Sequence, residues 1–186
     1  MFRSLRQADF KAKSKFNDIY GKISNIEWKE IYVLARSLKV LNSMKDLQYK
    51  ILFRFVATNK LLFKMGKVAS RACTFCEIEQ ESIEHLFFDC QMIKDFWLSI
   101  FEIWNYITNS NVLPTSRDIL LGRYFERTEK GEILNTLIII GKFYIWNCKL
   151  KLNLTNVKLF QDIVKETFFV CNSGNIQDTI RNFCEL

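Results

Sequence analysis

Half of the chain's six cysteines and its only histidine lie within one short stretch, CTFCEIEQESIEHLFFDC at residues 73–90. Their spacing is Cys-x2-Cys-x8-His-x4-Cys, and the first two cysteines are close enough for one tight turn to direct both thiolates at the same cation. Three thiolates with one imidazole form a common tetrahedral ligand set for Zn²⁺. The predicted metal ligands are Cys73, Cys76, His85 and Cys90.

Four protein ligands complete a tetrahedral site and leave no position for a reactive water. We therefore expect one structural zinc ion that folds this segment and does not catalyse hydrolysis. The alternative is a set of buried cysteines and a core histidine without a metal. Cys148, Cys171 and Cys184 are isolated in the sequence and are expected to be core thiols.

An enzyme is the least favoured interpretation of this composition. The single histidine is one of the predicted metal ligands, so no Ser/His or Cys/His pair remains for nucleophilic catalysis. The six glycines are scattered and form no phosphate-binding loop. The acids around the predicted site are interpreted mainly as solvated charge, some of which could orient His85. They are Glu77, Glu79, Glu81, Glu84, Asp89 and Asp95.

The charge of the chain, formally +7, is unevenly distributed. Residues 1–72 carry 16 Lys and Arg against 5 Asp and Glu, whereas residues 73–105 carry 1 against 7. A block this basic favours a polyanionic partner, nucleic acid before an anionic membrane, although solubility alone is the alternative. The predicted nucleic-acid contacts form a basic stripe that leads to the first cysteine, and its alternative role is a solvated helix face. They are Lys50, Arg54, Lys60, Lys64, Lys67 and Arg71.

Two aromatic residues lie near this stripe. Phe63 and Phe75 could stack on bases, as aromatic side chains do in proteins that bind single strands. The favoured alternative is that both belong to the hydrophobic core.

Apolar residues recur at helical spacing nearly throughout, which predicts an all-α fold with one embedded CCHC zinc knuckle. Ser24 and Glu27 form a capping-box pattern at the start of one helix. A second helix is expected to begin near Ser43, and a shorter one to run from Thr58 to Gly66. The predicted buried stripe of the second helix is Leu47, Ile51, Leu52, Phe55 and Val56.

Further helices are expected over 92–107, over 129–152, from Thr155 onward and near the C-terminus. Gly141 would let another helix approach closely. The turn-forming stretch TNSNVLPTSR, with the only proline, marks a boundary. The predicted segments are a basic, frayed tail (1–23), a basic helical segment (24–72), the zinc-binding module with its following helix (73–108), a linker (109–117) and a C-terminal helical segment (118–186).

The cysteine stretch resembles the zinc-binding region at the C-terminal end of reverse transcriptases from LINE-type (non-LTR) retrotransposons. The family pattern is Cys-x2-Cys, then Glu-Ser/Thr, then His-Leu-Phe and a closing Cys. The likeness extends upstream through LQYKILFRFVATNKLLFKMG and downstream through FWLSIFEIWNYI, ILLGR and LNTLIIIGKFYIWNCK, over about residues 25–165. Gln91 stands where the family commonly has proline.

The resemblance implies that the four predicted ligands bind zinc. It also implies a role in binding template RNA or target DNA during target-primed reverse transcription. The polymerase signature with its Asp-Asp pair is absent, and nothing resembles the endonuclease. The resemblance therefore favours a non-catalytic module.

Two other functions stay open at the level of sequence. One is a zinc-stabilised helical scaffold that binds a protein through its C-terminal helices, and the other is a retrotransposon-derived relic without a selected role. No secretory signal or membrane-spanning run is evident, so we expect an intracellular protein, nuclear or cytoplasmic, whose cysteines stay reduced.

Overall fold

Helices form nearly all the regular structure in the part of the chain that the computed structural model describes, residues 2–126, 128–171 and 178–186. The elements are α1 (Phe2–Tyr20), α2 (Asn25–Ser37), α3 (Asn42–Leu52), α4 (Asn59–Lys64), a π-helical turn η1 (His85–Asp89), α5 (Gln91–Thr108), α6 (Ser116–Leu121), α7 (Glu129–Lys151), α8 (Val157–Cys171) and α9 (Asp178–Glu185). The predicted all-α fold is confirmed.

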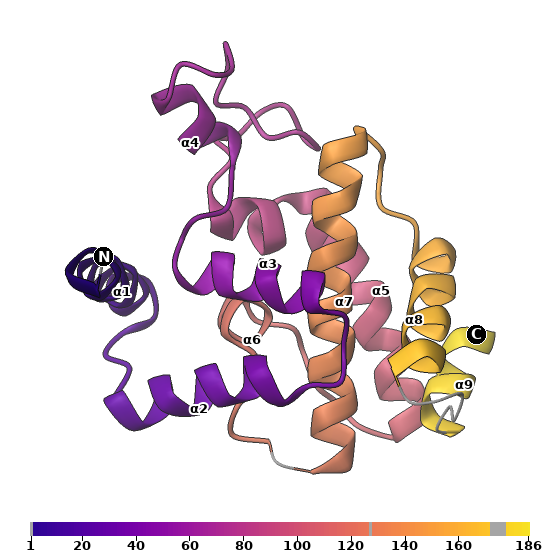
Figure 1. The fold of residues 1–186 in the computed structure, drawn as a ribbon. Coiled ribbons are helices and arrows are strands. Elements are labelled where there is room, and N and C mark those ends of the chain that lie inside the picture. The colour runs from indigo at the N-terminus through magenta and orange to yellow at the C-terminus, as the bar shows by residue number, and fades with distance from the viewer. Residues whose placement is uncertain (1, 127, 172–177) are drawn as a thin grey trace.

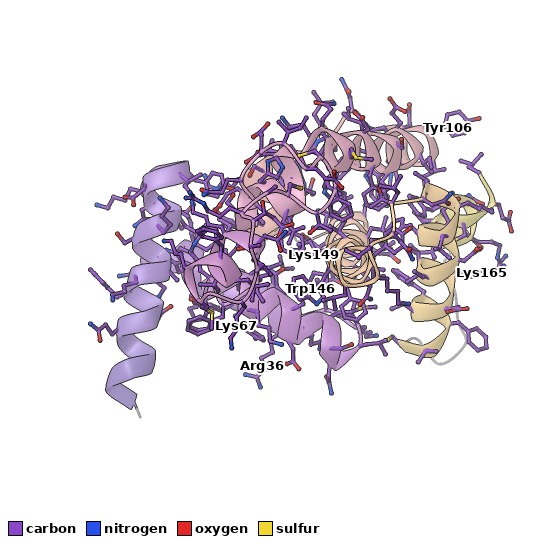
Figure 2. The ribbon with its side chains drawn as sticks, turned by 90° about the horizontal axis from the view of Figure 1, so that it is seen from above. Arg36, Lys67, Tyr106, Trp146, Lys149 and Lys165 are labelled. Carbon is purple, nitrogen blue, oxygen red and sulfur yellow. The ribbon has the colours of Figure 1, made fainter. Side chains whose placement is uncertain are left out.

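The long helix α7 runs through the centre of the molecule (Figure 1). It packs against α3, α8 and η1, while α5 packs against η1, α8 and α9. α4 and the cysteine-rich residues extend beyond the bundle at the end that the C-terminus of α7 reaches (Figure 1). Seen from above, α1 stands at one edge and α7 at the centre (Figure 2).

Several local predictions are confirmed, because helix capping depends on short sequence patterns. Ser24 accepts a hydrogen bond from the Glu27 amide and the Glu27 carboxylate accepts one from the Ser24 amide, which is the expected capping box. The Thr58 side chain caps α4, and Gly66 follows that helix with a left-handed φ of 66°. The helices expected over 92–107 and 129–152 are α5 and α7.

Two predictions about helix limits are wrong. Residues 1–23 were expected to be frayed, but α1 forms there and buries Phe16 completely beside Trp28. α3 ends at Leu52, so Phe55 does not belong to its buried stripe and is 58% exposed. A smaller difference concerns α8, where Asn156, and not Thr155, accepts the capping hydrogen bond from the Leu159 amide.

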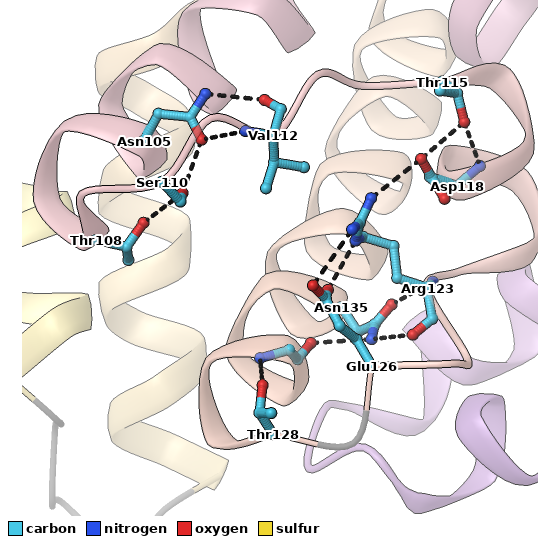
Figure 3. Close-up of polar contacts among 11 residues, drawn as sticks. Asn105, Thr108, Ser110, Val112, Thr115, Asp118, Arg123, Glu126, Thr128 and Asn135 are labelled. Carbon is cyan, nitrogen blue, oxygen red and sulfur yellow. Dashed lines mark hydrogen bonds and ion pairs between the residues drawn. The ribbon is translucent and has the colours of Figure 1, made fainter.

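The segment 109–117, expected to be a linker, is held to the bundle by side-chain hydrogen bonds (Figure 3). The Asn105 amide group on α5 donates to the Val112 carbonyl and accepts from the Val112 amide. Farther along, Arg123 pairs with Asp118 and Glu126. These bonds fix the path from α5 to α7, whereas the division of the chain into five segments stays a prediction.

At Gly141, α7 leaves room for the Trp97 side chain of α5, so the close approach predicted there is made by a side chain and not by a second helix backbone. A Cβ atom added at Gly141 would lie 2.4 Å from the ring of Trp97 on α5. The next residue, Lys142, is fully buried, and its ammonium nitrogen donates to the Gln48 side chain on α3. Burial lowers the pKa of Lys142 to about 7, so this lysine is partly neutral near neutral pH.

Within the described residues, no helix has both the length and the apolar character that a bilayer crossing requires.

Gly141→Ala is expected to destabilise the protein by about 1–3 kcal/mol because the added methyl group overlaps the Trp97 ring. The overlap outweighs the higher helix propensity of alanine, which is worth about 1 kcal/mol. Urea unfolding followed by circular dichroism measures this free energy. Leu150→Ala on the exposed side of the same helix is the control, and a Gly141→Ala protein as stable as that control would contradict the packing described here.

Candidate metal centre

The four predicted ligands come together in one cluster. The side-chain atoms that Cys73, Cys76, His85 and Cys90 offer all lie within 4.8 Å of one another. The Cys76 Sγ and His85 Nε2 are 3.4 Å apart. A tetrahedral zinc ion with bonds of about 2.3 Å to sulfur and about 2.0 Å to nitrogen would separate two such ligand atoms by about 3.5 Å. The cluster therefore fits a single metal ion.

The first two ligands lie on a tight loop. The Cys73 amide donates to the Glu79 carbonyl, and the Glu77 amide donates back to the Cys73 carbonyl. An isolated β-bridge between Ala72 and Gln80 closes the base of this loop. Glu77 has a left-handed φ of 58°, which turns the chain between the second cysteine and the bridge. Cys73 is buried, whereas Cys76 is partly exposed.

The last two ligands lie at the two ends of η1. Residues five apart point about 140° away from each other around an ordinary α-helix. Here the Cys90 amide donates to the carbonyl of His85 at 3.0 Å, which widens the turn so that the two residues lie one above the other. The turn begins where the Ser82 hydroxyl accepts a hydrogen bond from the His85 amide. The π-helical turn therefore brings the imidazole and the last thiol into one cluster that could hold a metal ion.

The imidazole is oriented by a carboxylate. His85 Nδ1 lies 3.4 Å from a carboxylate oxygen of Glu79, while Nε2 points at Cys76. A carboxylate on one ring nitrogen fixes the tautomer that presents the other nitrogen to a metal. Glu79 itself is mostly exposed. It is thus the acid that performs the orienting role expected from the sequence.

The thiols differ in their electrostatic setting. Burial raises the pKa of Cys73 to about 12, although backbone amides of Cys76 and Phe75 act in the opposite direction. Burial also acts to raise the pKa of Cys76, but hydrogen bonds from the amides of Glu79 and Ile78 and from His85 outweigh it and lower the pKa to about 6. A divalent cation would stabilise all the thiolates, since its charge favours their ionised form.

A buried ion pair joins the cysteine loop to α7. The Glu81 side chain has no exposed surface, and its carboxylate lies 2.7 Å from the ammonium nitrogen of Lys149. The same carboxylate accepts hydrogen bonds from the Asn59 amide, the Thr74 amide and the Thr74 hydroxyl. Burial alone would raise the pKa of Glu81, but Lys149 and these donors outweigh burial and hold that pKa below its usual value.

Lys149 completes the network from the side of α7. Its ammonium group also donates to the Asn59 side chain at 2.9 Å and to the Thr74 hydroxyl at 3.1 Å. Thr74 lies between the first two predicted ligands, and Asn59 begins α4. The network therefore fixes the cysteine loop, α4 and α7 relative to one another.

Two of the six acids expected to be solvated are buried instead. Glu81 pairs with Lys149, and Glu84 receives two hydrogen bonds from the guanidinium group of Arg54, at 2.6 and 3.1 Å. The sequence could not reveal either pair, because the partners lie 68 and 30 residues away along the chain. Both carboxylates therefore form ion pairs within the fold and are not part of the solvated surface.

The predicted basic stripe is divided by the fold. Arg54 is directed inward to Glu84, and its guanidinium group also lies over the Phe16 ring. Lys50, Lys64, Lys67 and Arg71 are exposed, and Lys60 is partly exposed. Of the two aromatic residues, Phe75 belongs to the core, and Phe63 is 39% exposed beneath the guanidinium group of Arg71.

Residues 10–97 match the family model described as zinc-binding in reverse transcriptase. This segment of the chain is therefore similar to the zinc-binding region of reverse transcriptases. The match includes the four clustered ligands, but it ends before the downstream part of the predicted resemblance. No curated protein and no solved structure matches the chain.

The family assignment agrees with the geometry of the cluster. In the zinc-binding region, four protein ligands would complete a tetrahedral site, which is typical of metals that stabilise a fold. The match covers no catalytic domain of a reverse transcriptase.

Cys73→Ser and His85→Ala are each expected to abolish metal binding and to lower the helical content, because three remaining ligands cannot hold the loop and η1 together. Metal analysis of the purified protein and circular dichroism measure the two effects. Cys171→Ser, a change outside the cluster, is the control and should keep both properties. Metal retained by the His85→Ala protein would contradict the ligand assignment.

Lys149→Met is expected to destabilise the protein by about 3–5 kcal/mol, because it leaves the Glu81 carboxylate buried without its cation. It should also speed the loss of metal to a chelator. Adding Glu81→Gln should recover part of the loss, since it removes the unpaired charge. Lys151→Met, an exposed change on the same helix, is the control, and equal stability of the two lysine variants would refute the role of the pair.

Proposed function

We propose that the chain is a non-catalytic module that binds nucleic acid and is stabilised by one zinc ion. The zinc ion would be held by the four clustered ligands, since the family is zinc-binding and the geometry fits that ion. In a reverse transcriptase of LINE type, such a module would bind template RNA or target DNA. The thiol ligands would require a reducing location, nuclear or cytoplasmic.

The observation that carries this proposal is the difference between the paired acids of the cysteine segment and the exposed cations of the first 72 residues. Both buried acids of the cysteine segment, Glu81 and Glu84, are held in internal ion pairs with Lys149 and Arg54. Over the first 72 residues, in contrast, many cations are exposed and have no ion pair with another described residue. They are Lys11, Lys15, Lys22, Lys29, Arg36, Lys39, Lys50, Lys64, Lys67 and Arg71. Such a surface favours phosphate contacts and binding that depends on salt.

The protein-scaffold alternative gains less support from the fold. α7, the longest of the C-terminal helices, is covered by its neighbours along most of its length. A partner protein would therefore have to use α8 or α9. Binding through these helices stays a prediction.

Affinity for an oligonucleotide is expected to fall as salt rises, because each phosphate contact releases counterions. Replacing Lys60, Lys64 and Lys67 with glutamate should weaken binding by roughly tenfold or more and make the salt dependence shallower by up to about 0.7 in logarithmic slope for each lost contact. Fluorescence anisotropy over a salt series measures both effects.

Lys165→Glu is the matched control for this charge reversal. Lys165 is exposed on α8, on the opposite side of α7 from Lys67 (Figure 2). Binding that is absent at low salt, or that does not respond to salt, would contradict the proposed function. Capture of a partner protein that survives both nuclease and the triple charge reversal would favour the scaffold instead.

A further inference from the structure

The end of α3 has an unusual backbone. The Phe55 amide donates to the Lys50 carbonyl at 2.7 Å, and the Arg54 amide donates to the Ile51 carbonyl at 3.0 Å. This pair of bonds defines a Schellman motif, in which the residue with left-handed φ is commonly glycine. Here that residue is Arg54, with φ of 59°. An arginine in this conformation is strained, so other contacts must hold it there.

Two contacts of the Arg54 side chain supply that restraint. Its guanidinium group makes the two hydrogen bonds to Glu84 and covers the Phe16 ring at 5.1 Å. Glu84 immediately precedes the metal ligand His85, and Phe16 lies on α1. The turn after α3 is therefore fixed both by the metal-binding segment and by α1, and it has one defined direction.

This fixed turn places a row of aromatic rings at the surface. The rings of Tyr32 and Phe53 are 6.0 Å apart at an interplanar angle of 27°, and those of Phe53 and Phe55 are 6.3 Å apart at 16°. Phe55 is the outermost ring of the row and is 58% exposed. In a Schellman motif, a hydrophobic residue at this position frequently packs back on one of two helix positions, which here are held by the exposed Lys50 and the partly buried Tyr49.

Phe55 separates two hollows in the surface. One hollow, of about 370 Å³, lies against α1 and is lined by Lys11, Lys15 and Phe53. The other, of about 290 Å³, lies between α3 and α7 and is lined by Lys50 and Trp146. Trp146 projects from the central helix α7 (Figure 2). Because Phe55 lines both hollows, they lie on either side of this one ring, and we call the two hollows together the aromatic groove.

The charges along the aromatic groove are mainly positive. Lys11 and Lys15 lie one helical turn apart on α1, are exposed, and have no ion pair with a described residue. Lys50 is likewise exposed on the other side of Phe55. Arg54 is neutralised by Glu84, and Asp46 lines the second hollow as its one carboxylate. Three available cations thus flank the exposed rings.

We propose that the aromatic groove binds single-stranded nucleic acid, with bases stacked on Phe55 and Trp146 and phosphates held by Lys11, Lys15 and Lys50. This inference rests on the proposed function and adds to it a site for single strands, beside the basic surface that carries Lys60, Lys64 and Lys67. The exposed Phe55 ring and the partly exposed Trp146 ring lie between cations, which matches the alternation of base and phosphate along a single strand. In a duplex the base faces are stacked on their neighbours, so the exposed rings select the unpaired strand.

The location differs from the stripe expected from the sequence. Lys50 belongs to both, but the aromatic groove adds Lys11 and Lys15 from α1, the segment expected to be a frayed tail. Arg54 contributes by fixing the turn and makes no phosphate contact. The arrangement depends on α1, the end of α3 and α7, which are far apart in the sequence.

The test measures the affinity of the full, metal-loaded chain for labelled oligonucleotides of about 12 nucleotides, a length within the range that single-strand binders occupy. Oligo(U) and oligo(dT) are the single strands, and a duplex of equal length is the comparison. Phe55→Ala should weaken single-strand binding by about tenfold, as expected for the loss of one base–aromatic stack, while Phe55→Tyr should retain it. Duplex binding should change little.

Phe169→Ala is the matched control, because Phe169 is a phenylalanine of similar exposure, 57%, on α8. Circular dichroism and metal content establish that each variant is folded. Equal single-strand affinity of the Phe55→Ala and Phe169→Ala proteins, or an equal loss on strand and duplex, would overturn the aromatic groove while leaving salt-dependent binding in place. A wild-type chain that binds none of the oligonucleotides would overturn the proposed function as well.

Discussion

The ion pair between Glu81 and Lys149 joins the metal-binding segment to the rest of the molecule. A carboxylate without solvent contact is costly unless a cation and hydrogen-bond donors replace its water. Glu81 receives an ammonium group from α7, one backbone amide from the start of α4, and an amide and a hydroxyl from Thr74. Thr74 stands between two metal ligands, so the position of the carboxylate and the shape of the cysteine loop are determined together. A metal bound by the cysteine loop and the packing of α7 would therefore support each other.

This coupling extends the structural unit beyond the segment that matches the family. The match ends at Trp97. The Trp97 indole donates to the Phe87 carbonyl in η1, while its ring packs at Gly141 of α7. Lys149 also lies outside the match, yet it supplies the charge that neutralises Glu81. A metal-binding loop this short cannot bury a core of its own, and here α5 and α7 provide that core. The segment that matches the family and the C-terminal helices are thus parts of one packed structure.

The sequence predicted the features that depend on neighbours along the chain. The ligand set is recognisable because residue type and spacing are sufficient, and the caps at Ser24 and Thr58 need only the next three residues. The features that escaped prediction depend on partners far along the chain. From the sequence, Glu81 and Glu84 were interpreted as solvated acids, because only the fold shows that they pair with Lys149 and Arg54. The π-helical turn was not predicted for a different reason. Its hydrogen bond, from the Cys90 amide to the His85 carbonyl, corresponds to no local propensity that the sequence reveals.

Net charge along the sequence is accordingly a poor guide to charge on the surface. Residues 73–105 are the most acidic part of the chain, yet two of their carboxylates are internal and a third orients His85. Arg54 shows the converse, because it belongs to the most basic segment but is neutralised by Glu84 and acts as a structural residue. Its pairing holds a strained turn, and that turn exposes Phe55 between the lysines of α1 and α3. The acidic segment thus contributes to the basic surface indirectly: Glu84 fixes the geometry there, and the lysines supply its charge.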